Sequence, residues 1–130
     1  MVYRYEDLII WQLARTLVGK IYASLQEVKD YGFRDQIQRA SVSVMNNIAE
    51  GFQRHKFTTD NKTFISYLNI AYGSCGEVKS MLYIAEDIRY LDAAILKELH
   101  SLCTSLECKI EALIVSMRKN EKRMLNINQS

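Results

Sequence analysis

Apolar side chains recur along most of the chain at alternating steps of three and four residues, the spacing that gives an α-helix one apolar face. This pattern predicts four helices. The first starts after Asp7 and ends at the sequence KDYG (29–32), and the second covers about residues 33–54. The third follows the capping residues 58–60, and the fourth follows Asp92.

Strand patterns are absent, and the chain contains no proline that would break a long helix. We therefore predict an all-α fold, an up-down-up-down antiparallel four-helix bundle. The apolar lines of three helices are Trp11, Ala14, Val18, Ile21, Leu25 and Val28; Phe64, Leu68, Ala71, Cys75, Val78, Leu82 and Ala85; and Ile95, Leu99, Leu102, Leu106, Ile110, Leu113 and Met117.

The second predicted helix, with the sequence IQRASVSVMNNIAEGFQRHK at 37–56, is apolar over more than one face. Its small and apolar residues fill roughly 200° of the helix circumference, which is nearly twice what a four-helix core needs. We expect the surplus to contact another subunit, the alternative being an exposed edge of alanine and valine. The residues are Ile37, Ala40, Ser41, Val42, Val44, Met45, Ile48, Ala49, Gly51 and Phe52.

A line of polar residues runs down the back of the same helix. When the hairpin is folded about residue 57, Arg39 comes level with Glu77, beside Gly73 and Gly76 in the third helix. Mid-helix glycine costs about 1 kcal/mol relative to alanine and suits a close helix crossing. We predict a largely buried polar seam between the two helices or between subunits, the alternative being a solvated back face. Its members are Arg39, Ser43, Asn46, Asn47, Glu50 and Glu77.

The net charge of +2 is unevenly distributed along the chain. Residues 118–130 hold four cations and one acid, so residues 1–117 are close to neutral. We expect residues 1–117 to form the four-helix domain and residues 118–130 to be a basic, frayed or disordered extension. The extension is weaker than the basic surface of a dedicated nucleic-acid binder and could also be a solvated helix end that complements the macrodipole.

Catalytic and ligand-binding patterns are weak in this sequence. His100, Cys103 and Glu107 share one side of the fourth predicted helix, but a second inward pair of metal ligands is missing. The carboxylates of Glu50 and Glu77 lie several turns apart in the folded hairpin. We expect no catalytic residue, metal, cofactor or small-molecule substrate.

Compartment is indicated by two further features. The chain has no apolar run of the roughly 20 residues that a membrane span needs, and its start lacks a signal-peptide pattern. Its three cysteines are odd in number and fall within helical patterns, so we expect reduced thiols of the kind found in cytosolic proteins. We expect a cytoplasmic protein without a membrane partner.

Three segments carry a family resemblance: YEDLIIWQLA (5–14), QIQRASVSVMNNIAEG (36–51) and YLNIAYGSCGEVKSML (67–82). They resemble, in order and spacing, the signature blocks of the bacterial 23S rRNA intervening-sequence proteins, and the resemblance covers about residues 3–117. The chain departs from that pattern at Gln38, where the family usually has a second arginine, and at Met45, where it usually has proline. The first departure weakens an anionic-ligand site there, and the second implies a straighter helix.

The resemblance implies a four-helix bundle that assembles into a ring-like homopentamer. It also implies kinship with the accessory proteins of diversity-generating retroelements, which bind a reverse transcriptase and nucleic acid. No biochemical activity follows from it.

Two classes of function remain open. The first is a non-catalytic oligomeric adaptor that binds RNA or an RNA-protein partner through a basic surface, where avidity in a ring multiplies a weak patch. The second is a protein-only assembly scaffold with no nucleic-acid role. The basic surface would consist of Arg54, His55, Lys56, Lys62, Arg118, Lys119, Lys122 and Arg123.

Overall fold

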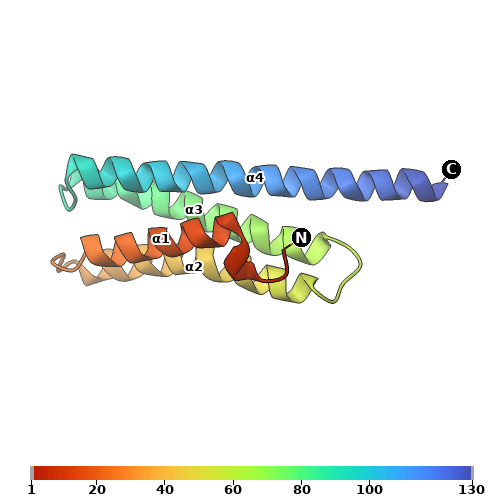
Figure 1. Cartoon of the computed structure of the whole chain (residues 1–130). Helices are drawn as coiled ribbons and strands as arrows, with labels where there is room; N and C mark the ends of the chain where they lie inside the picture. The colour runs from red at the N-terminus through yellow and green to blue at the C-terminus, as the bar shows by residue number, and fades with distance from the viewer. Residues whose placement is uncertain (1, 130) are drawn as a thin grey trace.

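The computed structural model describes residues 2–129, with side chains described as far as Glu121. A short 3-10 turn η1 (Tyr5–Asp7) precedes four helices: α1 (Ile9–Ser24), α2 (Tyr31–His55), α3 (Lys62–Asp87) and α4 (Ala93–Gln129). No strand occurs in the described residues, in agreement with the predicted all-α class. The helices lie side by side, with α1 against α2 and α4, and α3 against α2 and α4 (Figure 1).

Side-chain caps define two of the helix starts. Asp92 accepts a hydrogen bond from the amide of Ile95 at 2.9 Å, as the sequence predicted for α4. Asp30 caps α2 in the same way through the amide of Phe33 at 3.2 Å. Asp7 does not cap α1, because it belongs to η1 and α1 begins only after Leu8.

One core joins all four helices, and the predicted apolar line of α3 is buried along its whole length. In α1 and its C-cap the buried line follows the prediction at Ala14, Ile21 and Leu25, but Ile10 and Leu17 are buried in place of Trp11 and Val18, which are half-buried. This difference leaves the indole of Trp11 at the edge of the core. The fully enclosed core side chains are Leu17, Ile21, Leu25, Ile37, Val44, Ile48, Leu68, Val78, Leu82, Leu99, Leu106 and Ile110.

The helices α2 and α3 approach each other closely at Gly51. A Cβ added there would lie 2.6 Å from the Cβ of Tyr67, a separation that real side chains do not tolerate. The sequence predicted the close crossing at Gly73 and Gly76, and that prediction is wrong within the chain. An added Cβ at either position meets nothing within 4 Å, because both residues face away from α2.

The apolar surplus of α2 is smaller than predicted. Val42, Met45, Ala49 and Phe52 are half-buried, and Met45 and Phe52 pack against the core. The turn η1 also lies against α2 and covers part of this helix from within the same chain.

The last helix continues to Gln129, past residue 117, where the sequence predicts the end of the four-helix domain. Residues 93–129 contain neither glycine nor proline and are rich in good helix formers, so nothing in the sequence stops the helix. Figure 1 shows α4 running past the other helices on the side where the α2–α3 loop lies. No described helix carries an apolar stretch that could span a bilayer.

The contact at Gly51 yields a stability prediction. Gly51→Ala should lower the free energy of unfolding by about 1–3 kcal/mol, because the new methyl group must displace Tyr67 or separate the helices. Gly19→Ala is the matched control, since an added Cβ at Gly19 in α1 meets nothing within 4 Å. It should raise stability by about 0.5–1 kcal/mol through helix propensity. Urea denaturation of both variants measures the difference, and equal stabilisation by both would show that α2 and α3 do not touch at Gly51.

Candidate nucleic-acid interface

The end of α2 holds a compact cluster of Arg54, Glu50 and Tyr67. Arg54 donates hydrogen bonds from Nε and Nη2 to Glu50 Oε1 at 3.3 and 3.1 Å, and its guanidinium lies 5.6 Å from the centre of the Tyr67 ring. The hydrogen bond to Glu50 raises the pKa of Arg54 above its usual value, with Tyr67 adding to the effect. Arg54 therefore stays a cation, but the Glu50 carboxylate offsets its charge and occupies its donors, which makes it a weaker phosphate ligand than the sequence predicted.

His55 forms hydrogen bonds to other residues of the α2–α3 loop and holds its two sides together. His55 Nδ1 lies 3.1 Å from the carbonyl oxygen of Asp60 and 3.3 Å from the hydroxyl of Thr58, and its ring lies tilted beside the Phe64 ring with the centres 5.5 Å apart. His55 thus has a structural role in the loop.

Lys56 and Lys62 flank this loop on its two sides. Both are exposed, and neither forms an ion pair with the described residues. Their ammonium groups carry the available positive charge of the loop.

Asn61, which precedes α3, attaches the loop to the far part of α4. Its backbone N–H donates to Glu121 Oε1 at 2.7 Å, and its side-chain amide donates to the carbonyl of Met117 at 3.2 Å. A carboxylate at this position also complements the positive end of the α3 dipole. Two cation-bearing segments that are far apart in sequence, residues 54–62 and 118–123, therefore meet at one end of the molecule, which we term the basic end.

Within the α4 part of the basic end, Arg118 and Lys119 are exposed. Lys122 and Arg123, also predicted for the nucleic-acid surface, lie on the helix, but their side chains are outside the described ones.

The predicted buried polar seam is wrong within a single chain. Arg39 is exposed and does not pair with Glu77, whose carboxylate instead accepts a hydrogen bond from Gln36 at 3.4 Å. The reason is geometric: the close contact at Gly51 turns Arg39 to the outer edge of α2. Asn46 is likewise exposed.

Three members of that line form a hydrogen bond between α2 and α3, namely Ser43, Glu50 and Glu77. The hydroxyl groups of Ser43 and Ser74 are 2.8 Å apart, and Asn47 donates to both the carbonyl and the hydroxyl of Ser43. These short polar side chains fix the pairing of the two helices over one turn. Arg39, Asn46, Glu50 and Glu77 are exposed in the single chain, and a polar seam between subunits stays a prediction.

The buried Cys75 thiol, in the α3–α4 contact, is a poor nucleophile. The Cys75 thiol donates to the carbonyl of Cys103 at 3.3 Å, and its contact with the Cys103 thiol together with burial raises its pKa far above the usual range. Glu107 pairs with Lys79 at 3.4 Å. Among the described residues, no group of three histidine, cysteine or acidic side chains is placed to hold a metal ion.

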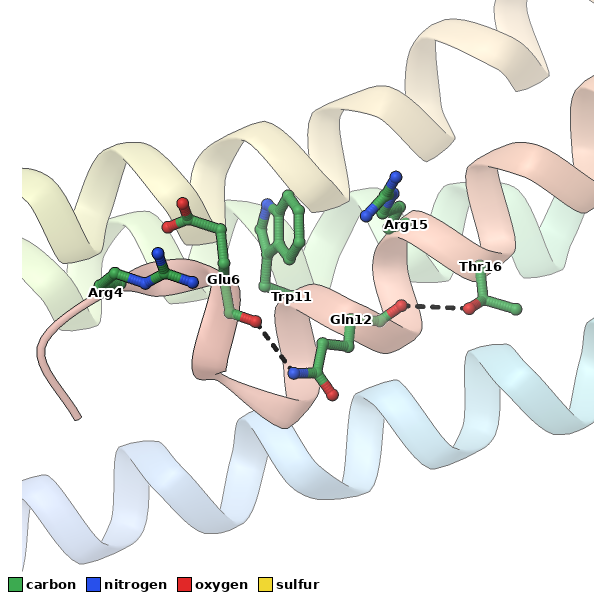
Figure 2. A pocket seen from close by; sticks show the side chains of 6 residues that line it. All are labelled: Arg4, Glu6, Trp11, Gln12, Arg15 and Thr16. Atoms are coloured by element: carbon green, nitrogen blue, oxygen red, sulfur yellow. Dashed lines mark hydrogen bonds between the residues drawn. The ribbon is translucent and has the colours of Figure 1, made fainter. Parts of the chain in front are cut away.

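A cleft of about 740 Å³ lies where η1 meets α1. Figure 2 shows the Trp11 indole between the Glu6 carboxylate and the Arg15 guanidinium. The guanidinium lies 5.8 Å from the centre of the indole ring, and the Tyr5 ring meets the indole edge-on at 5.2 Å. The lining residues are Arg4, Glu6, Trp11, Gln12, Arg15 and Thr16.

The sequence prediction missed this cleft because Trp11 was placed in the apolar core line. The available signal was the spacing of Arg15 four residues after Trp11, which puts both side chains on one helix face. Glu6 of the turn η1 also lines the cleft, and a three-residue turn is too short to show helical periodicity.

Fold and surface together define an all-α protein of four packed helices with one basic end. The chain belongs to the family described as 23S rRNA-intervening sequence protein, whose family model matches residues 6–112. The family resemblance of the three sequence blocks is thereby confirmed. No curated protein sequence matches the chain significantly.

A solved structure supports the fold. The chain is similar to a crystal structure from Bacteroides thetaiotaomicron, described as a protein with unknown function from the S23 ribosomal protein family. The two share 22% sequence identity with a TM-score of 0.73, over 82% of this chain and 98% of the other. At this identity the likeness concerns the fold alone.

The attachment of α4 to Asn61 can be tested by mutation. Glu121→Ala should lower the free energy of unfolding by about 1–2 kcal/mol, because it removes a charged acceptor and leaves the Asn61 amide without its partner. It should also speed hydrogen exchange of the amides in residues 61–65. Glu111→Ala, an exposed acid on the same helix, should change stability by less than about 0.5 kcal/mol. Equal effects of the two substitutions would contradict the attachment.

Proposed function

We propose that the protein is a non-catalytic oligomeric adaptor that binds RNA, or an RNA-protein partner, through its basic end. The observation that carries the proposal is the attachment of Asn61 to Met117 and Glu121, which brings the loop cations beside those of α4. Lys56, Lys62 and Lys119 are then the main phosphate ligands, because Arg54 is engaged by Glu50 and His55 by the loop. Phosphate contacts of this kind position a strand without reading its sequence.

The absence of catalysis is part of the proposal. The carboxylate of Glu50 is occupied by Arg54 and by the hydroxyl of Tyr67, and the buried thiol of Cys75 is kept protonated. The free state of Cys75, Cys103 and Cys108 fits a cytoplasmic location. Kinship with accessory proteins of diversity-generating retroelements would make a nucleic-acid-bound protein the natural partner.

The proposal includes an up-down-up-down bundle that assembles into a ring-like homopentamer. Support comes from the outer line of α3, where Ile70, Gly73, Glu77 and Ile84 fall on one helix face by their spacing. Ile70 and Ile84 are 49% and 45% exposed, respectively, and the exposed glycine leaves room for a neighbouring backbone. This face replaces the half-buried arc of α2 as the contact surface. A ring would present five basic ends and multiply the affinity of each.

Phosphate binding at the basic end has a defined salt signature. Lys56→Ala with Lys62→Ala should weaken binding of single-stranded RNA across unrelated sequences and lower the slope of log affinity against log salt by about 1.4, or about 0.7 per lost contact. Lys29→Ala with Lys97→Ala removes the same charge from exposed positions in other parts of the surface and should leave the slope nearly unchanged. Filter binding at several salt concentrations measures both. Equal losses would indicate a general charge effect, and RNA binding unaffected by either pair would favour the protein-only scaffold.

Assembly can be tested on the outer face of α3. The wild-type protein should scatter light as a particle of five times the chain mass of 15.1 kDa. Ile84→Glu should dissociate it, because a carboxylate would be buried without a partner in the contact. Ile9→Glu is the matched control, because it makes the same substitution at a side chain of α1 that is 63% exposed and lies outside the proposed contact. This variant should keep the assembly intact. A wild-type monomer at micromolar concentration would contradict the ring.

A further inference from the structure

We propose that the cleft between η1 and α1 binds one nucleotide of single-stranded RNA, with the base stacked on Trp11 and the phosphate held by Arg15 and Arg4. This inference deepens the proposed function by assigning a base-stacking site separate from the basic end. A partly buried tryptophan at the surface, flanked by arginines, is the combination that sequence-tolerant binding of single strands uses.

The contacts of Trp11 explain how a base can enter. Arg15 is exposed and lies over the indole at 5.8 Å, an interaction worth little at an exposed site. A nucleobase has a larger flat surface than a guanidinium and can take its place on the ring. The displaced Arg15 then remains within reach of the phosphate on the same nucleotide, where its planar fork can form two hydrogen bonds.

The rest of the cleft fits the same ligand. Tyr5 holds the indole from its edge at 5.2 Å, and the Gln12 amide donates to the Glu6 carbonyl at 2.9 Å, which ties η1 to α1. The Glu6 carboxylate is an acceptor with no ion-pair partner in the described residues, and it can accept from a ribose hydroxyl or a base N–H. Arg4 adds a second cation, only loosely held by exposed Asp7 at 3.6 Å. The volume of about 740 Å³ accommodates a nucleotide.

The place of the cleft also favours a nucleic-acid strand. Figure 1 shows the N-terminal segment on the side of the molecule toward the α2–α3 loop and the extension of α4. One strand could therefore contact both the basic end and Trp11.

The chain has a single tryptophan, so its fluorescence reports on this cleft alone. Titration of the full-length protein with hexa-adenylate RNA, excited at a wavelength selective for indole, should quench the emission at saturation. Inorganic polyphosphate of similar charge is the base-free control and should leave the emission almost unchanged. Quenching by polyphosphate to the same extent would overturn the stacking site, because phosphate contacts alone would then account for it.

Substitutions of Trp11 separate the loss of base stacking from a loss of packing in the protein. Trp11→Leu should weaken hexa-adenylate binding by roughly 5- to 100-fold, and Trp11→Phe should recover most of the affinity. Arg15→Gln should weaken it by roughly three- to tenfold and lower the salt slope by about 0.7. Arg89→Gln, at an exposed arginine in the α3–α4 loop, is the charge-matched control and should have little effect.

The outcomes distinguish this cleft from the basic end. RNA binding that requires Lys56 and Lys62 but leaves the emission of Trp11 unchanged would overturn the cleft and keep the proposed function. Quenching that is lost with Arg15→Gln but not with the lysine pair would support the cleft and overturn the role of the basic end. A protein that binds no hexa-adenylate overturns both.

Discussion

The close approach of α2 to α3 at Gly51 is the constraint on which the rest of the molecule depends. With only a hydrogen atom at this position, the backbone of α2 can lie against the side chain of Tyr67, and the serine pair Ser43–Ser74 then fixes the same two helices two turns further along. Every outward residue of the hairpin takes its direction from this pairing. It turns Arg39 to solvent, and it places Glu50 where Tyr67 and Arg54 can share its carboxylate.

The same pairing sets where the cations gather. Because α2 ends and α3 begins at one end of the molecule, the loop between them meets the part of α4 that follows Met117, and Asn61 bonds the two together. The far part of α4 is thereby held beside Lys56 and Lys62 although it lies about 60 residues away in sequence. A chain with a net charge of only +2 can in this way present a local basic surface without being a basic protein.

The sequence predicted the features that depend on local periodicity and capping. Four helices, the buried line of α3 and the cap at Asp92 follow from residue spacing and were confirmed, as was the family. The position of the close crossing was wrong, because glycine marks where a backbone can approach but spacing cannot show from which side. The bond from Asn61 to Glu121 and the cleft at Trp11 could not be predicted, since both depend on how η1 and α4 lie against other elements. No stretch of local sequence encodes that arrangement.

Photo-crosslinking tests the central claim most directly, namely that one RNA strand contacts both the basic end and the cleft. A short RNA carrying 4-thiouridine would be irradiated with the full-length protein, and the modified residues would be mapped by mass spectrometry. The account predicts adducts on Trp11 or Tyr5 and on residues of the α2–α3 loop or Tyr67, with Tyr31 and Tyr83 unmodified although both are more than half exposed. Adducts confined to the cleft or to the loop alone, or concentrated on Tyr31 and Tyr83, would contradict it.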